Sequence, residues 1–310
     1  MSRTIVITGA TGFIGGVLAK RLSSPEYRVR ALVRSASYNK RPQDIEVDWV
    51  TGDLDNIESL QQLVDGADAI VHCAGTVRGA VQNDFDKVNV DGVAQLVKVA
   101  AQLSPTPRFL LISSLAAREP QLSDYASSKL KGEKALATSS GNMFWSVMRP
   151  PAVYGPGDRE MRPLFQWMLR GFAPLIGSDK NRVSLLYVQD LVDAIVSWLD
   201  SSCQPQQFYE LHDGHENGYS WQEIIETVER LRGNSVFRTN IPIPLVNAIA
   251  SMNLMITKVL GSSPILTPGK VRELTHANWV ANNHLLSSQT GWAPKTSLEK
   301  GLRQTFESVI

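Results

Sequence analysis

The stretch that decides the fold is Thr4-Ile5-Val6-Ile7-Thr8-Gly9-Ala10-Thr11-Gly12-Phe13-Ile14-Gly15. Its first five residues are all β-branched, which is typical of a strand in a buried sheet. The glycines that follow, spaced Gly-x-x-Gly-x-x-Gly, predict a tight turn that opens a helix and lets backbone N–H groups approach a pyrophosphate. We therefore predict a dinucleotide site at Gly9, Thr11, Gly12, Phe13, Ile14 and Gly15. The spacing departs from Gly-x-Gly-x-x-Gly, and glycines used only for turning and packing are the alternative.

Beyond this turn, short apolar runs alternate with amphipathic stretches. The runs 4–8, 28–33, 47–51, 69–73, 108–113 and 144–149 have the character of strands. Apolar residues recur near the helical period in 13–22, 57–64, 88–103 and 123–137. Strands that alternate with helices, and that are apolar on both faces, predict an α/β fold with a doubly wound parallel Rossmann sheet.

The alternation stops after Pro150-Pro151, and Tyr154-Gly155-Pro156-Gly157 marks a turn. Residues 183–188, 190–199 and 207–211 resemble one more βαβ element of the sheet. We therefore predict a dinucleotide-binding domain over 1–150 and 183–212. Residues 151–182 and 213–310 would form a smaller, mainly helical substrate lobe, with helices near 221–231, 245–260 and 298–309.

The bulk composition points to a small-molecule partner. The 310 residues include 31 basic and 30 acidic side chains, so bulk charge favours neither nucleic acid nor an anionic membrane. Cys73 and Cys203 are expected to be reduced thiols, and a cytoplasmic setting is the default. Because the sequence enters its first predicted strand within a few residues, we expect no signal peptide. No metal site is expected.

The longest apolar stretch, 241–260, contains Pro242, Pro244, Asn247, Asn253 and Lys258. These interruptions argue against a transmembrane helix. A helix that lines a pocket or covers the core is the favoured interpretation, and contact with a membrane surface is the less favoured one, because the polar face of the stretch is not basic.

The residue after the second predicted strand bears on the choice of cofactor. An NAD site would carry a carboxylate there for the ribose 2′-hydroxyl, but this strand ends Ala31-Leu32-Val33-Arg34-Ser35. A guanidinium can pair with a 2′-phosphate and stack beside it. The sequence therefore favours NADP(H) over NAD(H), with a solvated surface arginine as the alternative.

A tyrosine and a lysine stand four residues apart, at Tyr125 and Lys129, so that a helix would place both on one face. A nearby cation lowers the pKa of a phenol and fits it for proton transfer. Ser113 and Ser114 end the fifth predicted strand and could hold a substrate oxygen. Tyr-x-x-x-Lys is common by chance, but its place after this strand favours a catalytic centre over a surface helix.

Together these residues resemble the extended short-chain dehydrogenase/reductase family, which includes nucleotide-sugar epimerases and dehydratases and 3β-hydroxysteroid dehydrogenases. The similarity also covers Gly52-Asp53-Leu54, His72-Cys73-Ala74-Gly75, Asn89-Val90-Asp91-Gly92, the segment from Arg149 to Gly157, the segment from Tyr187 to Ile195, and Thr290-Gly291-Trp292-Ala293-Pro294.

The resemblance implies a role for each matching position. Ser114 would be the catalytic serine, Tyr125 the acid and base, and Lys129 the residue that lowers the pKa of Tyr125 and holds the ribose; Asn89 would complete the catalytic set. The cofactor would also contact Asp53, Leu54, Cys73, Ala74, Gly75, Ser113, Pro150, Ala152 and Val153. A homodimer is expected from the same resemblance.

Three functions fit these features. The leading one is an NAD(P)H-dependent oxidoreductase that reduces a carbonyl or oxidises an alcohol on a small molecule. The second is a nucleotide-sugar epimerase or dehydratase that retains its cofactor, although the short connection from Ser114 to Tyr125 argues against a large nucleotide-sugar substrate. The third is a cofactor-binding regulatory or assembly protein without activity. The apolar 241–260 stretch would suit a lipophilic substrate if it lines the pocket. Arg162, Lys180 and Arg182 could anchor an anion, but a solvated position is favoured for each.

Overall fold

The structure is a computed structural model that describes residues 2–260, 264 and 266–307. Its contacts divide the chain into two compact units. The first comprises Met1–Pro120, Asp124–Arg149 and Trp198–Tyr209, and the second comprises Gln121–Ser123, Pro150–Ser197 and Glu210–Ile310. This boundary differs from the predicted one in placing residues 183–197 with the second unit.

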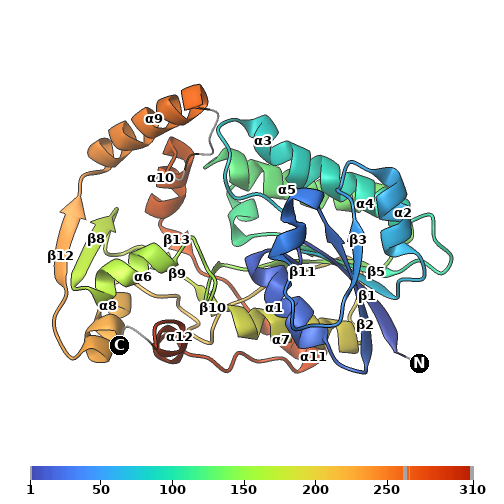
Figure 1. Ribbon diagram of the computed structural model, residues 1–310. Helices are drawn as coiled ribbons and strands as arrows, with labels where there is room; N and C mark the ends of the chain where they lie inside the picture. The colour runs from blue at the N-terminus through green and yellow to red at the C-terminus, as the bar shows by residue number, and fades with distance from the viewer. Residues whose placement is uncertain (1, 261–263, 265, 308–310) are drawn as a thin grey trace. The chain divides into compact units, whose positions relative to one another are not determined.

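The first unit is built on a seven-stranded sheet (Figure 1). Its order is β11-β6-β5-β4-β1-β2-β3, and the five neighbouring pairs from β6 to β3 are parallel. The strands are β1 (Arg3–Thr8), β2 (Tyr27–Val33), β3 (Asp48–Thr51), β4 (Ala69–His72), β5 (Arg108–Ile112), β6 (Trp145–Arg149) and β11 (Gln207–Glu210). The strand order reverses between β1 and β4, the place where doubly wound sheets bind their ligands. The predicted α/β fold is confirmed.

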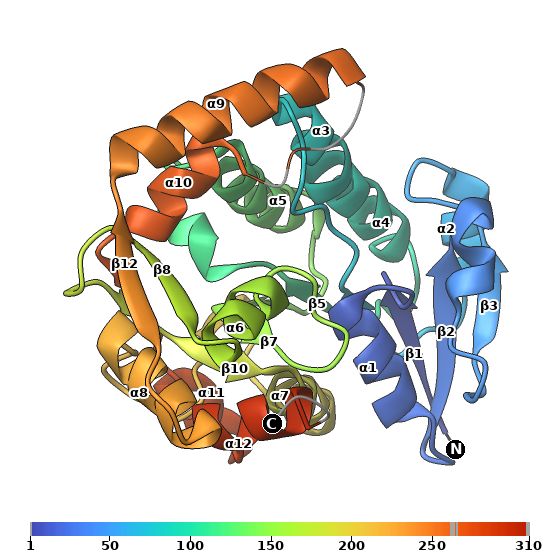
Figure 2. The same cartoon turned by 60° about the vertical axis from the view of Figure 1, so that its left-hand side comes forward.

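Helices α2 (Ile57–Val64), α4 (Gly92–Ala100) and α5 (Asp124–Ser139) share one apolar core with this sheet. Figures 1 and 2 show α4 and α5 side by side. Strand β1 is buried on both faces, because consecutive residues Ile5, Val6 and Ile7 are each fully inaccessible. Its neighbour in sequence, α1 (Phe13–Leu22), has the predicted bounds and buries Leu18 and Leu22. The β-branched character of β1 therefore reflects a sheet that is covered by helices on both sides.

The helix predicted over 88–103 begins earlier and is interrupted. It consists of α3 (Gln82–Asp86), a π-helical turn η2 (Lys87–Asp91) and α4. Asn89 lies in the π-helical turn. On the facing helix α5, a Cβ atom at Gly132 would come within 2.1 Å of the Asn89 carbonyl oxygen. The π-helical turn and α5 thus approach each other as closely as a residue without a side chain allows.

The second unit has short parallel strand pairs and several helices. The pairs are β7 (Ala152–Tyr154) with β10 (Leu185–Tyr187), β8 (Phe172–Ile176) with β12 (Phe237–Ile241), and β9 (Arg182–Val183) with β13 (Asn278–Trp279). The prediction that 183–188 adds a strand to the central sheet was therefore wrong. Two short strands stand there instead, because the partner of a strand is chosen by long-range pairing that the local pattern does not encode.

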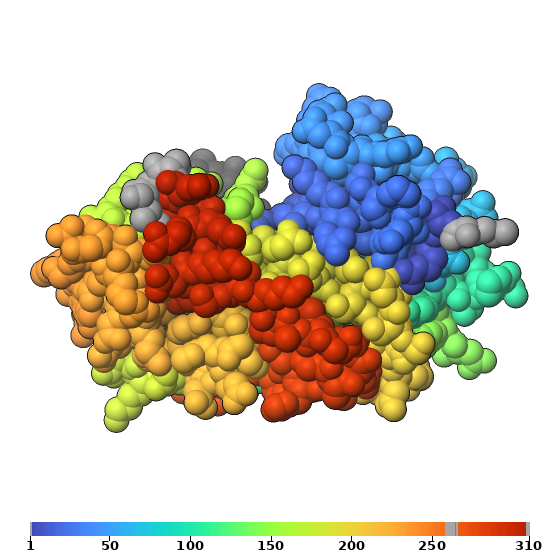
Figure 3. Space-filling view, turned by 90° about the horizontal axis from the view of Figure 1, so that it is seen from below, coloured from blue at the N-terminus to red at the C-terminus, as the bar shows by residue number. Residues whose placement is uncertain are grey.

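The helices of the second unit are α6 (Arg162–Leu169), α7 (Val188–Asp200), α8 (Trp221–Arg232), α9 (Ile243–Leu260), α10 (Pro268–Thr275), α11 (His284–Thr290) and α12 (Leu298–Thr305). Helices near 221–231, 245–260 and 298–309 were predicted, and residues 308–309 lie outside the described part of the chain. Helices α8 and α12 pack together around Tyr154 and Phe165, and Figure 3 shows α12 (red) at the surface. None of the described helices is long and apolar enough to cross a membrane.

Candidate active site

The glycine-rich turn after β1 is packed too closely for side chains. Gly9 has a φ of +73°, and a Cβ atom there would lie 2.7 Å from the backbone nitrogen of Ala74. A Cβ atom at Gly15 would lie 2.3 Å from the carbonyl oxygen of Gly9. Helix α1 begins directly after Gly12, so its first backbone N–H groups have no partner within the helix. The turn therefore presents main-chain donors at a helix N-terminus, which fits a dinucleotide pyrophosphate.

A buried hydrogen bond joins the ends of β1 and β4. The Oγ1 atom of Thr8 lies 2.8 Å from Nδ1 of His72, and it accepts a 3.2 Å hydrogen bond from the backbone N–H of Ala74. Burial lowers the pKa of His72 to about 3, so the ring is neutral, and its tautomer sets which of the two groups donates in the hydrogen bond to Thr8. Thr8 and His72 thus hold the Gly9 turn against Cys73, Ala74 and Gly75. The sequence reasoning missed this contact, although both residues stand at predicted strand ends.

Helix α5 carries Tyr125 and Lys129 on one face, as their spacing predicts. Tyr125 is half-buried, with its ring centroid 6.2 Å from that of Phe85. Lys129 is buried and donates a 2.9 Å hydrogen bond from Nζ to the backbone oxygen of Ile112, the last residue of β5. Burial lowers the pKa of Lys129 to about 8, against the opposing attraction of Glu133 and Cys73. A cation is therefore held at the end of β5, one turn from the phenol.

The two serines after β5 have different partners. Ser113 is buried and donates a 2.6 Å hydrogen bond to Oε1 of Glu133. Ser114 is only partly buried, caps the short helix η3 (Leu115–Arg118), and accepts a 3.2 Å hydrogen bond from the backbone N–H of Ala116. The hydroxyl of Ser113 therefore already donates to a carboxylate, whereas the hydroxyl of Ser114 can donate its hydrogen bond to a substrate.

Glu133 and Arg149 form a buried ion pair beneath this site. The guanidinium of Arg149 donates at 2.9 Å to Oε1 and at 2.6 Å to Oε2 of Glu133, whose side chain is 2% exposed. Glu133 lies one turn beyond Lys129 on the same helix. Sequence reasoning did not select Glu133; the signal that could have found it is the four-residue spacing that continues from Tyr125 and Lys129.

Asn89 is buried and its side chain is engaged by its neighbours. Its Oδ1 atom accepts a 2.9 Å hydrogen bond from the backbone N–H of Thr76, and Nδ2 donates to the Thr76 carbonyl at 3.0 Å and to Ser128 Oγ at 2.9 Å. A Cβ atom at Gly75 would lie 3.1 Å from Oδ1 of Asn89 and 3.8 Å from Nζ of Lys129. The structure thus brings Asn89, Gly75 and Lys129 together, and the hydrogen bonds of Asn89 hold the segment after β4 in place.

The predicted adenosine-side residues stand at the ends of β2 and β3. Arg34 follows β2 directly and its side chain is exposed. Asp53 follows β3 and accepts a 3.0 Å hydrogen bond from the backbone N–H of Asp55. Leu54 packs over Gly92, where a Cβ atom would meet Cδ1 of the leucine at 2.6 Å. An exposed cation therefore stands where the sequence analysis expects a 2′-phosphate.

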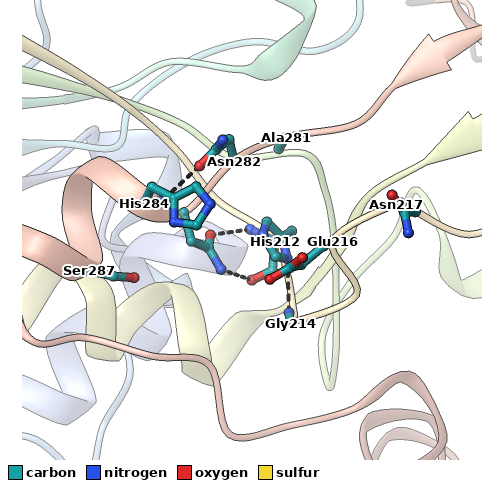
Figure 4. A pocket seen from close by; sticks show the side chains of 9 residues that line it. His212, Gly214, Glu216, Asn217, Ala281, Asn282, His284 and Ser287 are labelled. Carbon is teal, nitrogen blue, oxygen red and sulfur yellow. Dashed lines mark hydrogen bonds between the residues drawn. The ribbon is translucent and has the colours of Figure 1, made fainter.

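The remaining predicted residues belong to the second unit. Ala152 and Val153 lie in β7, after the buried Pro150. Among the proposed anion anchors, Arg182 pairs with Glu223 at 2.6 Å, which occupies its charge. A polar pocket of about 370 Å³ also lies in this unit, and Figure 4 shows His212, Asn282 and His284 around it. No motif in the sequence indicated this pocket.

Known proteins are similar to this chain in sequence and in fold. Residues 5–210 match the model of the NAD dependent epimerase/dehydratase family. A ceramide reductase from Caulobacter vibrioides is 34% identical, over 98% of this chain and 93% of that protein. A UDP-glucose 4-epimerase from Vibrio cholerae is 27% identical, over 100% of this chain and 96% of its own. A crystal structure of UDP-glucuronic acid 4-epimerase from Bacillus cereus with UDP-glucuronic acid and NAD superposes with a TM-score of 0.75 at 20% identity, covering 99% and 98% of the two chains.

The fold and the matching relatives define an enzyme of the extended short-chain dehydrogenase/reductase class. The chain belongs to the NAD-dependent epimerase/dehydratase family. The expectation of an NAD(P)-dependent oxidoreductase or epimerase is thereby confirmed at the level of the family.

Proposed function

We propose that this protein is an NADP(H)-dependent reductase that acts on a carbonyl group of a lipophilic, ceramide-like substrate. The observation that carries the proposal is the position of Lys129, whose buried Nζ is bonded to Ile112 at the end of β5 while Tyr125 shares its helix face. This places a cation, a phenol and the Ser113-Ser114 strand end in one region of the first unit. Such a set suits proton transfer to an oxygen.

Each side chain has a distinct part in this proposal. Ser114 donates a hydrogen bond to the substrate oxygen and stabilises the charge that develops on it. Tyr125 donates its phenolic proton to that oxygen, and the charge of Lys129 stabilises the phenolate that remains. The dinucleotide, when bound, supplies the hydride. In the reverse direction the phenolate of Tyr125 accepts the proton of an alcohol.

The dinucleotide would be held by the chain at several points. The backbone from Gly9 to Gly15 would hold the pyrophosphate, and Lys129 the nicotinamide ribose. Asp53, Leu54, Cys73, Ala74, Gly75 and Ser113 would line the site in the first unit, and Pro150, Ala152 and Val153 would contact the nicotinamide end. These contacts are proposed from the positions that match the family's motifs.

The preference for NADP(H) rests on Arg34. Its exposed guanidinium follows β2, where the family's NAD enzymes carry a carboxylate, and it would pair with the 2′-phosphate. The test is fluorescence titration with NADPH and NADH. We expect the wild type to bind NADPH more tightly than NADH. Arg34→Ala should weaken the affinity for NADPH by tenfold or more, as for the loss of a charge-assisted contact of about 1.5–3 kcal/mol, and should leave the affinity for NADH unchanged. Equal affinities in the wild type would contradict the preference.

The lipophilic substrate is supported by the 34% identical ceramide reductase, which spans nearly the whole chain. Helix α9 agrees with this proposal. Val246 and Ala250 are buried against Val271, whereas Ile249 and Met255 on the same helix are 45% and 70% exposed. The second unit therefore presents an apolar surface that can receive acyl chains.

The decisive experiment follows NADPH absorbance on mixing with an N-acylated long-chain amino ketone in detergent, and separately with UDP-glucose. A reductase consumes one NADPH for each alcohol formed. An epimerase, like the UDP-glucose 4-epimerase to which this chain is similar, would interconvert the sugar without net consumption of cofactor. Epimerisation of UDP-glucose in the absence of ketone reduction would overturn the proposal. If Tyr125→Phe had the same effect as wild type in cells, a non-catalytic binding protein would be favoured instead.

A further inference from the structure

The carboxylate of Glu133 is the centre of a buried network in the first unit. It receives two hydrogen bonds from Arg149, at 2.9 and 2.6 Å, and one from Ser113 at 2.6 Å. The side chain of Arg149 is 18% exposed, and its guanidinium carbon lies 4.9 Å from the ring centroid of Phe208. Both carboxylate oxygens of Glu133 thus have hydrogen-bond donors, although the side chain is removed from water.

This network is tied to the proposed proton-transfer residues by the geometry of α5 and β5. Tyr125, Lys129 and Glu133 follow one another at four-residue intervals and share one helix face. Lys129 holds the carbonyl of Ile112, and Glu133 holds the hydroxyl of the next residue, Ser113. Ser114, the proposed substrate-binding hydroxyl, follows directly. The last residue of β5, Ile112, and the residue after it, Ser113, are therefore hydrogen-bonded to two successive turns of α5.

A buried ion pair adds little stability by itself, because the cost of desolvating both charges offsets their attraction. Apolar side chains of similar size would pack as well between α5 and β6. The arrangement of this pair is better explained by what it holds in place. We propose that Glu133, paired with Arg149, is a positioning residue of the active site: it fixes the Ser113-Ser114 strand end and provides the negative charge that keeps Lys129 protonated beside Tyr125.

The titratable groups around Lys129 support this assignment, which rests on the proposed function of Tyr125 and Lys129. Lys129 interacts with His72 at the end of β4, with Cys73 directly after β4, and with Glu133 on its own helix. Burial lowers the pKa of His72 to about 3 and raises the pKa of Cys73 to about 12, so both are neutral near pH 7. Among these neighbours Glu133 is the main source of the attraction that opposes the effect of burial on the pKa of Lys129. The pKa of Lys129 is already lowered to about 8 by burial, so the loss of Glu133 would lower it further.

The test measures the titration of Lys129 directly. Protein labelled with ¹³C at the lysine Cε is titrated by NMR, and the Lys129 resonance is assigned by its absence in Lys129→Met. Glu133→Gln keeps the size of the side chain and a carbonyl acceptor for Ser113 while removing the charge. We expect the titration midpoint of Lys129 to fall by about one pH unit or more, as for the loss of a close opposite charge. The double variant Glu133→Gln/Arg149→Met removes the positive charge of Arg149 as well, and its midpoint should recover part of the shift.

A matched control is available on the same helix. Asp86 pairs with the half-exposed Lys131 of α5 at 2.7 Å, so Asp86→Asn removes an ion pair from α5 away from the buried network. Its Lys129 midpoint should equal that of wild type. An unchanged midpoint in folded Glu133→Gln would overturn the proposal. Because the titration needs neither cofactor nor substrate, this failure is distinct from the failure of the proposed reductase activity.

Activity provides a second readout. In the oxidation direction the reaction needs the phenolate of Tyr125, so a less charged Lys129 should move the acid limb of the kcat/KM profile to higher pH in Glu133→Gln. Glu133→Asp keeps the charge and should restore the wild-type position of this limb, even if kcat is lower. A profile that shifts equally in Glu133→Asp and Glu133→Gln would show that the charge is irrelevant and would overturn the proposal.

Discussion

The hydroxyl of Thr8 and the imidazole of His72 form a 2.8 Å hydrogen bond that joins the end of β1 to the end of β4. Both side chains are fully buried, and Thr8 also accepts from the backbone of Ala74. The Gly9 turn, which carries the main-chain donors of the proposed pyrophosphate site, begins at the next residue. The affinity for a dinucleotide should therefore depend on this contact.

We predict that Thr8→Val weakens NADPH binding by about fivefold, which corresponds to one net hydrogen bond of ~1 kcal/mol. Valine keeps the β-branched shape for the strand but cannot bridge His72 and Ala74. Fluorescence titration measures the change, and Thr8→Ser, which keeps the hydroxyl, is the control. Affinity in Thr8→Val equal to that of wild type would show that the turn holds its shape without this bond.

The pH dependence of folding should report on His72. Its pKa is lowered from 6.5 to about 3 by burial. Below pH 6.5 the imidazole is therefore protonated in the unfolded chain but stays neutral in the folded chain. The stability that this neutral ring contributes is complete above 6.5 and is lost as the pH falls towards 3. In urea titrations, the free energy of unfolding of the wild type should fall by about 2 kcal/mol more than that of His72→Asn between about pH 7 and pH 5, at ~1.4 kcal/mol per pH unit. Parallel pH profiles for the two proteins would contradict this prediction.

The two serines after β5 should differ in their effects on catalysis. Ser114→Ala should lower kcat by about 10²–10³-fold, the usual cost of losing a donor to a developing oxyanion. Ser113→Ala should act mainly on stability, by about 1–3 kcal/mol, because it removes a partner of the buried Glu133 carboxylate. Rate measurements with NADPH and the amino ketone, together with thermal unfolding, separate the two. The assignment fails if Ser113→Ala is the variant with the larger loss of kcat.

Gly132 provides a test of packing between α5 and the π-helical turn. A Cβ atom there would come within 2.1 Å of the carbonyl oxygen of Asn89, which neither backbone can avoid without moving. Gly132→Ala should therefore destabilise the protein by about 1–3 kcal/mol, although alanine is the better helix former. Lys134→Ala, at an exposed position of the same helix, should stay within about 0.5 kcal/mol of wild type in chemical unfolding. Equal stabilities of the two variants would show that the helices separate easily.

Much of the first unit could be predicted because its signals are local. The glycine turn, the six strands up to 149 and the bounds of α1 and α2 follow from residue type and periodicity within a few residues. The helix predicted over 88–103 was placed too late, because Gln82-Asn83-Asp84-Phe85-Asp86 is polar and lacks a clear apolar stripe. Its helical form depends on packing: Phe85 is buried and lies against Tyr125.

The second unit was harder to predict because its strands are short and pair at a distance. Strand β10 pairs with β7 across 30 or more residues, and β12 with β8 across more than 60, and neither partner could be chosen from a local pattern. The prediction of the catalytic centre rests on local spacing and on the resemblance. It selected Ser114, Tyr125, Lys129 and Asn89 but not Glu133, because a glutamate in a helix is ordinarily a solvated residue.

The sequence by itself determined the α/β class, the dinucleotide turn and the shared helix face of Tyr125 and Lys129, since these depend on backbone sterics and periodicity over neighbouring residues. Only the tertiary structure decided which groups surround them. It buried Lys129 against Ile112, committed Ser113 to Glu133 and left Ser114 with a proton to donate. The physical reason is that burial and hydrogen-bond partners arise where segments distant in sequence meet, and these contacts set the charge and position on which proton transfer depends.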